Sequence, residues 1–177
     1  MMVPPDDLLQ ALDTLDPTTW SGVTYRFTSV KRANDPLSGG GAYLHGGRWN
    51  PRESFPCIYL AEPRETALAE LRRRADAAAG GAHRLPPQVL HEVRVNNLEV
   101  VDLVDPENRE HLGVTIDDIE GDDWSACQAV GAAAFFLGFQ GVRAPSATRT
   151  GQVVAVFERK LRPGQLVSHG QESIKLT

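Results

Sequence analysis

The pattern of apolar and polar positions in the first part of the chain predicts one helix, one strand and a long loop. Leucines at positions 8, 9, 12 and 15 form a helical stripe, and Asp16-Pro17 ends this helix. Residues 24–30, TYRFTSV, alternate between apolar and polar and include aromatic and β-branched side chains, which is typical of a strand. Residues 31–47 contain so many glycines and turn formers that we expect an irregular loop, and long loops in compact domains are often functional.

A buried strand followed by a helix is predicted next. The apolar run CIYLA, residues 57–61, has the length and composition of a buried strand. Pro63 suits a first helical position, and the alanine- and arginine-rich segment after it is expected to remain helical until Gly80-Gly81. These assignments place Tyr59 on the strand and Glu70 on the helix that follows it.

The second half of the chain contains several further strand patterns. Residues 89–95 and 98–103 both have strand-like sequences, and Asn96-Asn97 between them predicts a hairpin turn. The other predicted strands are 141–147, 153–158 and 166–176.

An apolar helix with defined ends is predicted among these strands. Asp122 or Asp123 can cap its N-terminus, residues 129–138 are almost entirely apolar, and Gly138 is a typical C-terminal stop. The chain has no internal repeat, low-complexity tract or interdomain linker. We therefore expect one domain over residues 1–177 with an α+β fold, in which helices flank a mixed, largely antiparallel sheet.

Composition and charge narrow the class of protein. The 177 residues include 18 basic and 23 acidic ones, a formal net charge of −5 without long blocks of either sign, which disfavours general nucleic-acid binding. Neither a signal-peptide pattern nor an apolar run of membrane-spanning length is present, so we expect a soluble, cytoplasmic protein. Cys57 and Cys127 have apolar neighbours and are expected to be buried free thiols, and no Cys/His cluster has the spacing of metal ligands.

Common active-site fingerprints fail when they are checked against the sequence. A GxGxxG motif starting at Gly39 would need glycine where Leu44 stands, and no P-loop motif occurs. The glycines at 39–41 are consistent with a mobile turn as well as with a functional loop. Ser146 is not part of a GxSxG elbow, so it is a poor hydrolase nucleophile and is either a turn serine or a hydroxyl presented at a strand end.

Arg48 stands in a glycine turn beside a large aromatic residue, in the sequence HGGRWNP. Its guanidinium could contact phosphate oxygens in a bidentate manner while the glycines let a ligand approach the backbone. Alternatively, Arg48 is a surface arginine stacked on Trp49. The sequence leaves these two interpretations open.

Tyr59 and Glu70 each have an ordinary structural interpretation and a functional one. Tyr59 points to the opposite sheet face from its two apolar neighbours, where its ring could stack on a cationic heterocycle or simply pack in the core. Glu70 could form an i,i+4 ion pair with Arg74 at the surface. However, Ala67 and Leu71 lie close to it on the helical wheel, which favours a carboxylate directed toward the protein.

Four motifs together resemble the RES domain, a bacterial toxin family. They are YRF, GGRWNP, IYLAEPRETALAE and APSA, in register from Tyr25 to Ser146, and the motif-bearing part of the chain is about 24–160. The resemblance implies functional positions at Arg26, Arg48, Tyr59, Glu70 and Ser146. One departure lies after VVAVF, where the chain continues as Glu158-Arg159-Lys160 and members of the family often have Asn-Pro and a histidine.

The resemblance implies an ADP-ribosyltransferase-like fold and activity on NAD as a substrate, without a metal. Members of the family degrade NAD by phosphorolysis or hydrolysis, or transfer ADP-ribose to a protein. They are toxins of toxin–antitoxin systems, neutralised by an antitoxin with an Xre-like DNA-binding part, so we expect such a partner and either a homodimer or a hetero-oligomer. A binding module without catalysis is the alternative from another class.

The chemistry expected of such a site assigns a role to each residue. Cleavage of the nicotinamide–ribose bond passes through an oxocarbenium-like state, which a carboxylate such as Glu70 would stabilise. Arg48, Tyr59 and Glu70 are therefore the expected catalytic residues. The residues expected to bind NAD are Arg26, Asn50 and Ser146. Phosphate, water and a protein side chain all remain possible acceptors.

Overall fold

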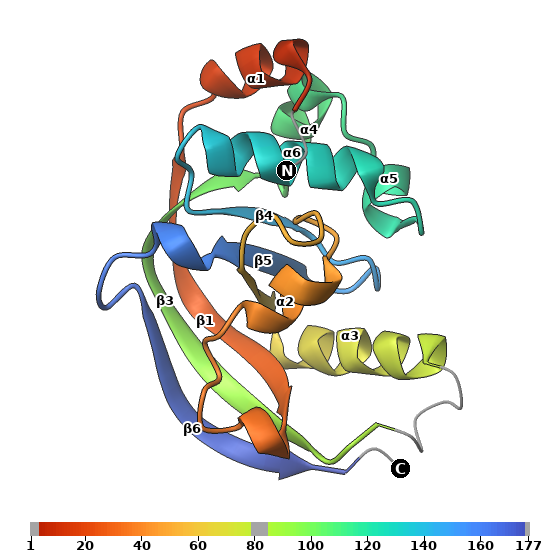
Figure 1. Cartoon of the computed structure of the whole chain (residues 1–177). Coiled ribbons are helices and arrows are strands. Elements are labelled where there is room, and N and C mark those ends of the chain that lie inside the picture. The colour runs from red at the N-terminus through yellow and green to blue at the C-terminus, as the bar shows by residue number, and fades with distance from the viewer. Residues whose placement is uncertain (1–3, 79–84, 176–177) are drawn as a thin grey trace.

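The computed structural model describes residues 4–78 and 85–175, which form a six-stranded sheet with helices around it (Figure 1). The strands follow the order β1-β2-β5-β4-β3-β6, and β1 pairs additionally with β3. Their bounds are β1 Thr18–Ser29, β2 Cys57–Glu62, β3 Gln88–Asp102, β4 Gly141–Pro145, β5 Gln152–Phe157 and β6 Leu166–Ile174.

Strand pairing closes five of the strands into a ring. β1 pairs with β3 over most of its length and with β2 at Tyr25 and Ala61, while β5 joins β2 to β4. A parallel pairing between β3 and β4 completes the ring, and every other pairing is antiparallel. β6 lies outside the ring against the first half of β3. The predicted α+β fold with a largely antiparallel sheet is confirmed.

Apolar side chains fill the ring and both of its helix-covered surfaces. Because side chains alternate along a strand, Ile58 and Leu60 of β2 pack inside the ring, whereas Tyr59 packs on the outside. The interior cluster consists of Ile58, Leu60, Val93, Val95, Leu98, Val100, Val154 and Val156. Tyr59 is thereby directed toward the helical side of the protein.

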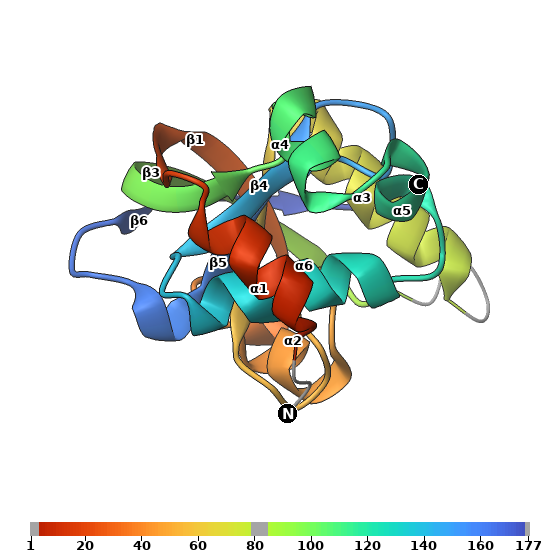
Figure 2. The same ribbon diagram turned by 90° about the horizontal axis from the view of Figure 1, so that it is seen from above.

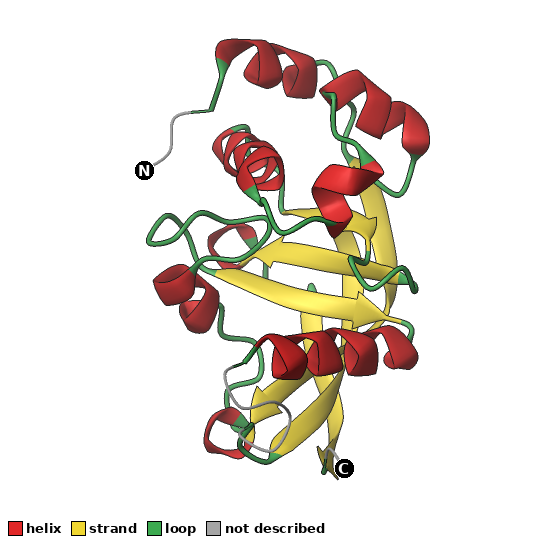
Figure 3. Cartoon of the chain, turned by 90° about the vertical axis from the view of Figure 1, so that its right-hand side faces the viewer, coloured by secondary structure: helices red, strands yellow, loops and turns green. Residues whose placement is uncertain are grey.

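The helices gather in two places around the ring. The α-helices are α1 Asp6–Asp13, α2 Gly40–His45, α3 Arg64–Ala77, α4 Pro106–Leu112, α5 Ile116–Glu120 and α6 Ser125–Phe136; the short 3-10 turns are Val30–Arg32 and Glu158–Lys160. Figures 1 and 2 show α1, α4, α5 and α6 grouped at one end of the molecule. Figure 3 shows α3 beside the strands further down, where it covers a separate apolar cluster, and Figure 1 shows α2 between the upper helices and α3.

The predicted hairpin at Asn96-Asn97 is wrong, because β3 continues through it as one strand. Asn97 has a φ of 48°, and the pairing register of β1 shifts between Trp20 and Gly22 opposite it, so the strand contains a bulge. Distant side chains satisfy the backbone at this point: Ser21 Oγ accepts from the Asn97 N–H at 2.8 Å, and Gln165 Nε2 donates to the Asn97 carbonyl at 2.8 Å. These contacts stabilise a bend where the local sequence favours a reversal.

The glycine-rich segment 31–47, expected to be irregular, contains the short helix α2. Such a helix would not be stable alone, so tertiary contacts must hold it. Glu158 Oε2 accepts from the Gly39 N–H at 2.6 Å, and Asn50 Nδ2 donates to the Ala42 carbonyl at 2.8 Å. The helices α4 and α5 were also not predicted.

Most of the other predicted elements are present. The N-terminal helix and the strands before and after residue 150 are confirmed, and Gly138 ends α6 with a φ of 90°. The N-cap residue of α6 is Trp124 and not one of the two predicted caps, although Asp123 just before it accepts a hydrogen bond from the Ser125 N–H at 2.9 Å. Pro63 precedes the first residue of α3 instead of forming it, and the predicted helix end at Gly80-Gly81 lies outside the described residues.

The two cysteines are buried free thiols, as predicted. Burial raises the pKa of Cys57 to about 12 and that of Cys127 to about 11, so both remain protonated at neutral pH. Within residues 4–78 and 85–175, no helix is both long and apolar enough to cross a membrane.

Candidate functional site

Glu70 and Ser146 meet between α3 and the turn that joins β4 to β5. The Ser146 hydroxyl donates a hydrogen bond of 2.6 Å to Glu70 Oε1, and Ser146 is only 1% exposed. Thr66 Oγ1, one turn earlier on α3, donates to the Thr150 carbonyl at 3.0 Å, which ties the helix to the same turn. The surface ion pair between Glu70 and Arg74 is absent from the ion pairs of the described residues, so that interpretation is wrong.

A chain of hydroxyl groups leads from this carboxylate to the protein surface. Ser146 Oγ lies 2.7 Å from Thr148 Oγ1, which lies 2.9 Å from the hydroxyl of exposed Thr150. The Thr148 N–H also donates to Ser146 Oγ at 3.1 Å. The Ser146 hydroxyl is therefore held by three hydrogen bonds to two residues, Glu70 and Thr148, and it fixes one carboxylate oxygen of Glu70.

Tyr59 supports the turn that carries Arg48. Its hydroxyl accepts from the Trp49 N–H at 2.9 Å and donates to Asn50 Oδ1 at 2.8 Å. Burial raises the pKa of Tyr59 well above its ordinary value, so the hydroxyl stays neutral and keeps its proton for Asn50. A side chain at Gly47 would overlap the Tyr59 hydroxyl, which explains the glycine at this position.

Asn50 is fully buried and engaged inside the chain. Its side-chain oxygen accepts from Tyr59 and its nitrogen donates to the Ala42 carbonyl. Backbone hydrogen bonds between Gly47 and Asn50 close the turn, with Gly47 N donating to the Asn50 carbonyl at 2.9 Å. Tyr59 and Asn50 thus form a rigid support that fixes Arg48 at the tip of the turn.

The guanidinium of Arg48 lies at the C-terminal end of α5. Arg48 Nη1 donates to the Gly121 carbonyl at 2.8 Å, and its Cζ lies 5.4 Å from the ring centroid of Trp124. Carbonyls at a helix C-terminus attract cations, which explains this placement. Burial lowers the pKa of Arg48, and the nearby charge of Arg73 lowers it further. Stacking on Trp49 is wrong, because Trp49 is fully buried and Trp124 is the aromatic partner.

Arg26 lies on β1 beneath the glycine-rich segment. Its Nη2 donates to the Ser38 carbonyl at 2.8 Å, while its Nη1 is buried without a hydrogen-bond partner in the described residues. Burial lowers the pKa of Arg26 to about 10, so it is still a cation at neutral pH. A buried guanidinium with an unsatisfied donor is a suitable anchor for an anionic ligand.

The structure thus brings five of the six predicted site residues into two groups. Arg48, Tyr59 and Asn50 form the first group, and Glu70 with Ser146 forms the second. Arg26 is separate, and its contact is with the Ser38 carbonyl. Among the residues that the structure describes, no cluster of His, Cys, Asp or Glu could hold a metal ion.

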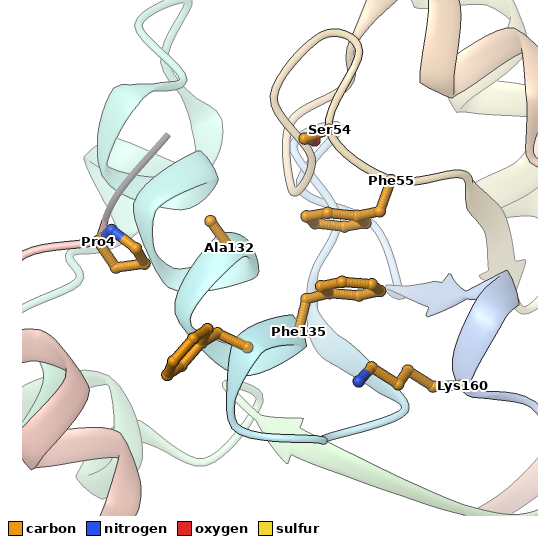
Figure 4. Close-up of a pocket in the computed structure, with 7 residues that line it drawn as sticks. Pro4, Ser54, Phe55, Ala132, Phe135 and Lys160 are labelled. Atoms are coloured by element: carbon orange, nitrogen blue, oxygen red, sulfur yellow. The ribbon is translucent and has the colours of Figure 1, made fainter. Parts of the chain in front are cut away.

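An apolar pocket of about 210 Å³ lies elsewhere, between α6 and the loop before β2 (Figure 4). Phe55 and Phe135 stack in it with ring centroids 4.2 Å apart, and Lys160 lies beside them. It contains none of the predicted site residues, and its volume is small for a dinucleotide. We therefore place the candidate site at the polar groups around Glu70 and not at this pocket.

Comparison with known families decides how this arrangement is classified. The model of the RES domain matches residues 23–176. The chain belongs to the RES domain family. The matched region of this RES domain includes the Ser146–Glu70 pair and the turn that carries Arg48.

Named relatives of this RES domain are NAD(+) phosphorylases. The NAD(+) phosphorylase MbcT of Mycobacterium bovis is 45% identical over 174 residues, covering 97% of this chain and 91% of that protein, and MbcT of Mycobacterium tuberculosis gives the same values. The probable NAD(+) phosphorylase Rv3189 of M. tuberculosis is 36% identical over 153 residues, which cover 84% of this chain and 68% of that protein. A chain in the crystal structure of the M. tuberculosis MbcT-MbcA toxin-antitoxin complex matches with a TM-score of 0.88, 43% identity and coverage of 97% and 93%.

Several residues beside the site were not predicted from the sequence of this RES domain. Thr148 contacts Ser146 two residues before it, and Trp124 contacts Arg48, which becomes its neighbour only through the fold. Arg73 and Arg149 carried no motif that would single them out. In the segment that departs from the family pattern, Glu158 holds the backbone of Gly39.

Proposed function

We propose that this RES domain protein is a toxin enzyme that cleaves NAD at the nicotinamide–ribose bond and transfers ADP-ribose to inorganic phosphate. The observation that supports this most is the Glu70 carboxylate, one oxygen of which is fixed by a buried serine hydroxyl. The names of the relatives, NAD(+) phosphorylases at up to 45% identity over nearly the whole chain, support the same substrate and acceptor.

Bond cleavage at the nicotinamide ribose needs little proton transfer, because the leaving group departs as a neutral ring. The developing charge is positive and lies on the ribose, as in glycoside hydrolysis. Glu70 would accept a hydrogen bond from a ribose hydroxyl with one oxygen while Ser146 holds the other. A carboxylate fixed in this way opposes the cation without having to reorganise during the reaction.

The remaining residues would bind and orient the dinucleotide. Arg48 is the proposed partner of the pyrophosphate, and the rigid turn held by Tyr59 and Asn50 limits the entropy lost when it binds. The Tyr59 ring is the proposed surface for nicotinamide, while its hydroxyl maintains the turn. Arg26 would contribute its free Nη1 donor to the anionic part of the ligand.

An antitoxin is the proposed partner, as in the complex of the structural relative. A protein that consumed NAD freely would harm its own cell, so the partner should cover the NAD site. The segment 38–47 is the proposed contact, because it borders both Arg26 and the Arg48 turn. An Xre-like DNA-binding part of the antitoxin, a homodimer or hetero-oligomer, and a cytoplasmic location belong to the same proposal.

The Glu70→Gln variant tests the proposed function. The amide oxygen can still accept from Ser146, so folding should persist, while the negative charge is lost. We expect nicotinamide release to fall by about 100-fold or more, the size of effect seen when one stabilising group is removed from a transition state. Glu65→Gln, an exposed change on the same helix, is the matched control. Turnover of Glu70→Gln near that of the control would remove Glu70 from the mechanism.

A further inference from the structure

Two arginines stand beside the Glu70–Ser146 pair without a role in the site described above. Arg73 follows Glu70 by three residues on α3, and residues three apart on a helix are neighbours on one face. Arg149 follows Ser146 by three residues in the turn between β4 and β5, and its N–H donates to the Ser146 carbonyl at 3.0 Å. Each member of the pair is therefore followed by an arginine three residues later in the chain.

Both arginines are held at a single residue, Glu120. Arg149 Nε donates to Glu120 Oε2 at 2.7 Å, and Arg73 Nη2 donates to the Glu120 backbone carbonyl at 3.1 Å. The other acidic neighbour of Arg73 is Asp122, at 3.7 Å and fully exposed. Glu120 thus brings two positive charges together, one from the helix and one from the turn.

The two arginines of this cluster face two carboxylates, Glu120 and Asp122, yet they keep donors that are exposed to solvent. The Arg149 side chain is 80% exposed and that of Arg73 is 35% exposed, so both retain N–H groups that a solute can reach. Exposed ion pairs contribute little free energy, so the contacts with Glu120 and Asp122 can be exchanged at small cost. Arg149 also has a φ of 63°, a conformation that non-glycine residues rarely adopt and that is often found at functional sites.

An oxyanion is the ligand that fits these donors. Guanidinium groups form paired hydrogen bonds with phosphate oxygens, and the Thr148 hydroxyl, one residue before Arg149, lies 2.7 Å from Ser146 Oγ. A phosphate dianion must approach the anomeric carbon close to the negative charge of Glu70. Cations next to that carboxylate are what such an approach requires.

The cluster lies next to the proposed dinucleotide anchor but has its own acceptor residue, Glu120. Arg48 is bound by the carbonyl of Gly121 and stacks toward Trp124, whereas Arg73 and Arg149 converge on Glu120. Arginines held at different acceptors suit a reaction with two anionic substrates, NAD and its acceptor.

We propose that Arg73, Arg149 and the Thr148 hydroxyl form the binding subsite for the inorganic phosphate that attacks NAD. This assignment rests on the phosphorolysis proposed above. In the step, a phosphate oxygen forms a bond to C1 of the nicotinamide ribose while the C1–N bond breaks. The electron pair of that bond leaves with neutral nicotinamide, and the remaining phosphate proton stays on the new phosphate ester or passes to water.

Steady-state kinetics on the partner-free protein test the subsite. Arg73→Gln and Arg149→Gln each remove one charge while keeping hydrogen-bonding capacity, and Arg72→Gln, an exposed neighbour on the same helix, is the control with the same charge change. We expect KM for phosphate to rise by about tenfold or more in the first two variants, since a charge-assisted hydrogen bond contributes roughly that much to binding. KM for NAD should stay within about twofold, and Arg72→Gln should match the wild type.

A second measurement keeps the subsite testable apart from turnover. Phosphate alone should raise the melting temperature of the wild-type protein and of Arg72→Gln, and this shift should shrink in Arg73→Gln and Arg149→Gln. A rise in KM for NAD in place of phosphate, or equal phosphate-induced shifts in all four proteins, would overturn the assignment. If the wild type consumes no NAD in phosphate buffer, the proposed function fails, and the melting shifts still decide whether the arginines bind phosphate.

Discussion

Removal of the Ser146 hydroxyl is the most informative single change in the site. Ser146→Ala deletes the donor of the 2.6 Å hydrogen bond to Glu70 Oε1 and the acceptor of the Thr148 N–H, at a position that is 1% exposed. Water cannot easily replace the lost donor there. The carboxylate would remain charged, but one of its oxygens would no longer be held.

The expected size of the effect follows from the type of hydrogen bond. A hydrogen bond to a charged group contributes about 1.5–3 kcal/mol, so we expect a loss of roughly 2 kcal/mol in the free energy of unfolding. For a chain of this length, that corresponds to a melting temperature lower by about 4–8 °C. If a similar free energy is lost from the transition state, kcat should fall by roughly 10- to 100-fold.

A double-mutant cycle with Glu70→Gln shows whether Ser146 acts through the carboxylate. Nicotinamide release would be measured at saturating NAD and phosphate for the wild type, both single variants and the double variant, and unfolding would be followed in parallel. If Ser146 only positions Glu70, Ser146→Ala should reduce kcat strongly in the wild-type background and only weakly in the Glu70→Gln background. Equal factors in both backgrounds, or wild-type kcat in Ser146→Ala, would refute this reasoning.

Three further substitutions test contacts that stabilise the fold around the site and in the sheet. Tyr59→Phe leaves the Trp49 N–H without its buried acceptor and should lower the free energy of unfolding by about 1–3 kcal/mol in urea denaturation; unchanged stability would contradict it. Gly131→Ala should destabilise the protein by at least about 2 kcal/mol, although alanine favours helices, because the new methyl group would overlap the Trp49 carbonyl; a rise in melting temperature would show that α6 packs differently. Burial lowers the pKa of His91, so the unfolded state takes up its proton first and wild-type stability should fall as the pH drops below about 6.5. His91→Gln should show a smaller difference between pH 7.5 and 5.5, and an equal difference would exclude His91 as the cause.

The sequence predicted correctly those elements that are specified by their own residues and not by contacts with distant ones. The apolar run of β2 and the helix stop at Gly138 needed no information from distant residues. The bulge at Asn97 could not be predicted, because the side chains that satisfy its backbone come from β1 and from the turn before β6. The same limit explains α2, whose glycines are held in a helix by Glu158 and Asn50.

The candidate site shows a similar division. Wheel positions around Glu70 correctly indicated that its side chain is directed toward the protein, but not that Ser146 is its partner, since Ser146 is brought to it by the pairing of β4 with β5. For Arg48, the neighbouring Trp49 suggested the wrong aromatic contact, because only the fold places Trp124 beside it. Residue types and their spacing therefore indicated the chemistry, and tertiary contacts determined the partners.

The central claim is tested most directly by following NAD with the wild-type protein, purified free of any partner, in buffers with and without inorganic phosphate. Nicotinamide and the ADP-ribose product would be separated by chromatography. The account predicts that NAD is consumed when phosphate is present and that ADP-ribose is recovered as its phosphate ester. Intact NAD in both buffers, or equal loss to free ADP-ribose in both, would contradict phosphorolysis at the Glu70 site.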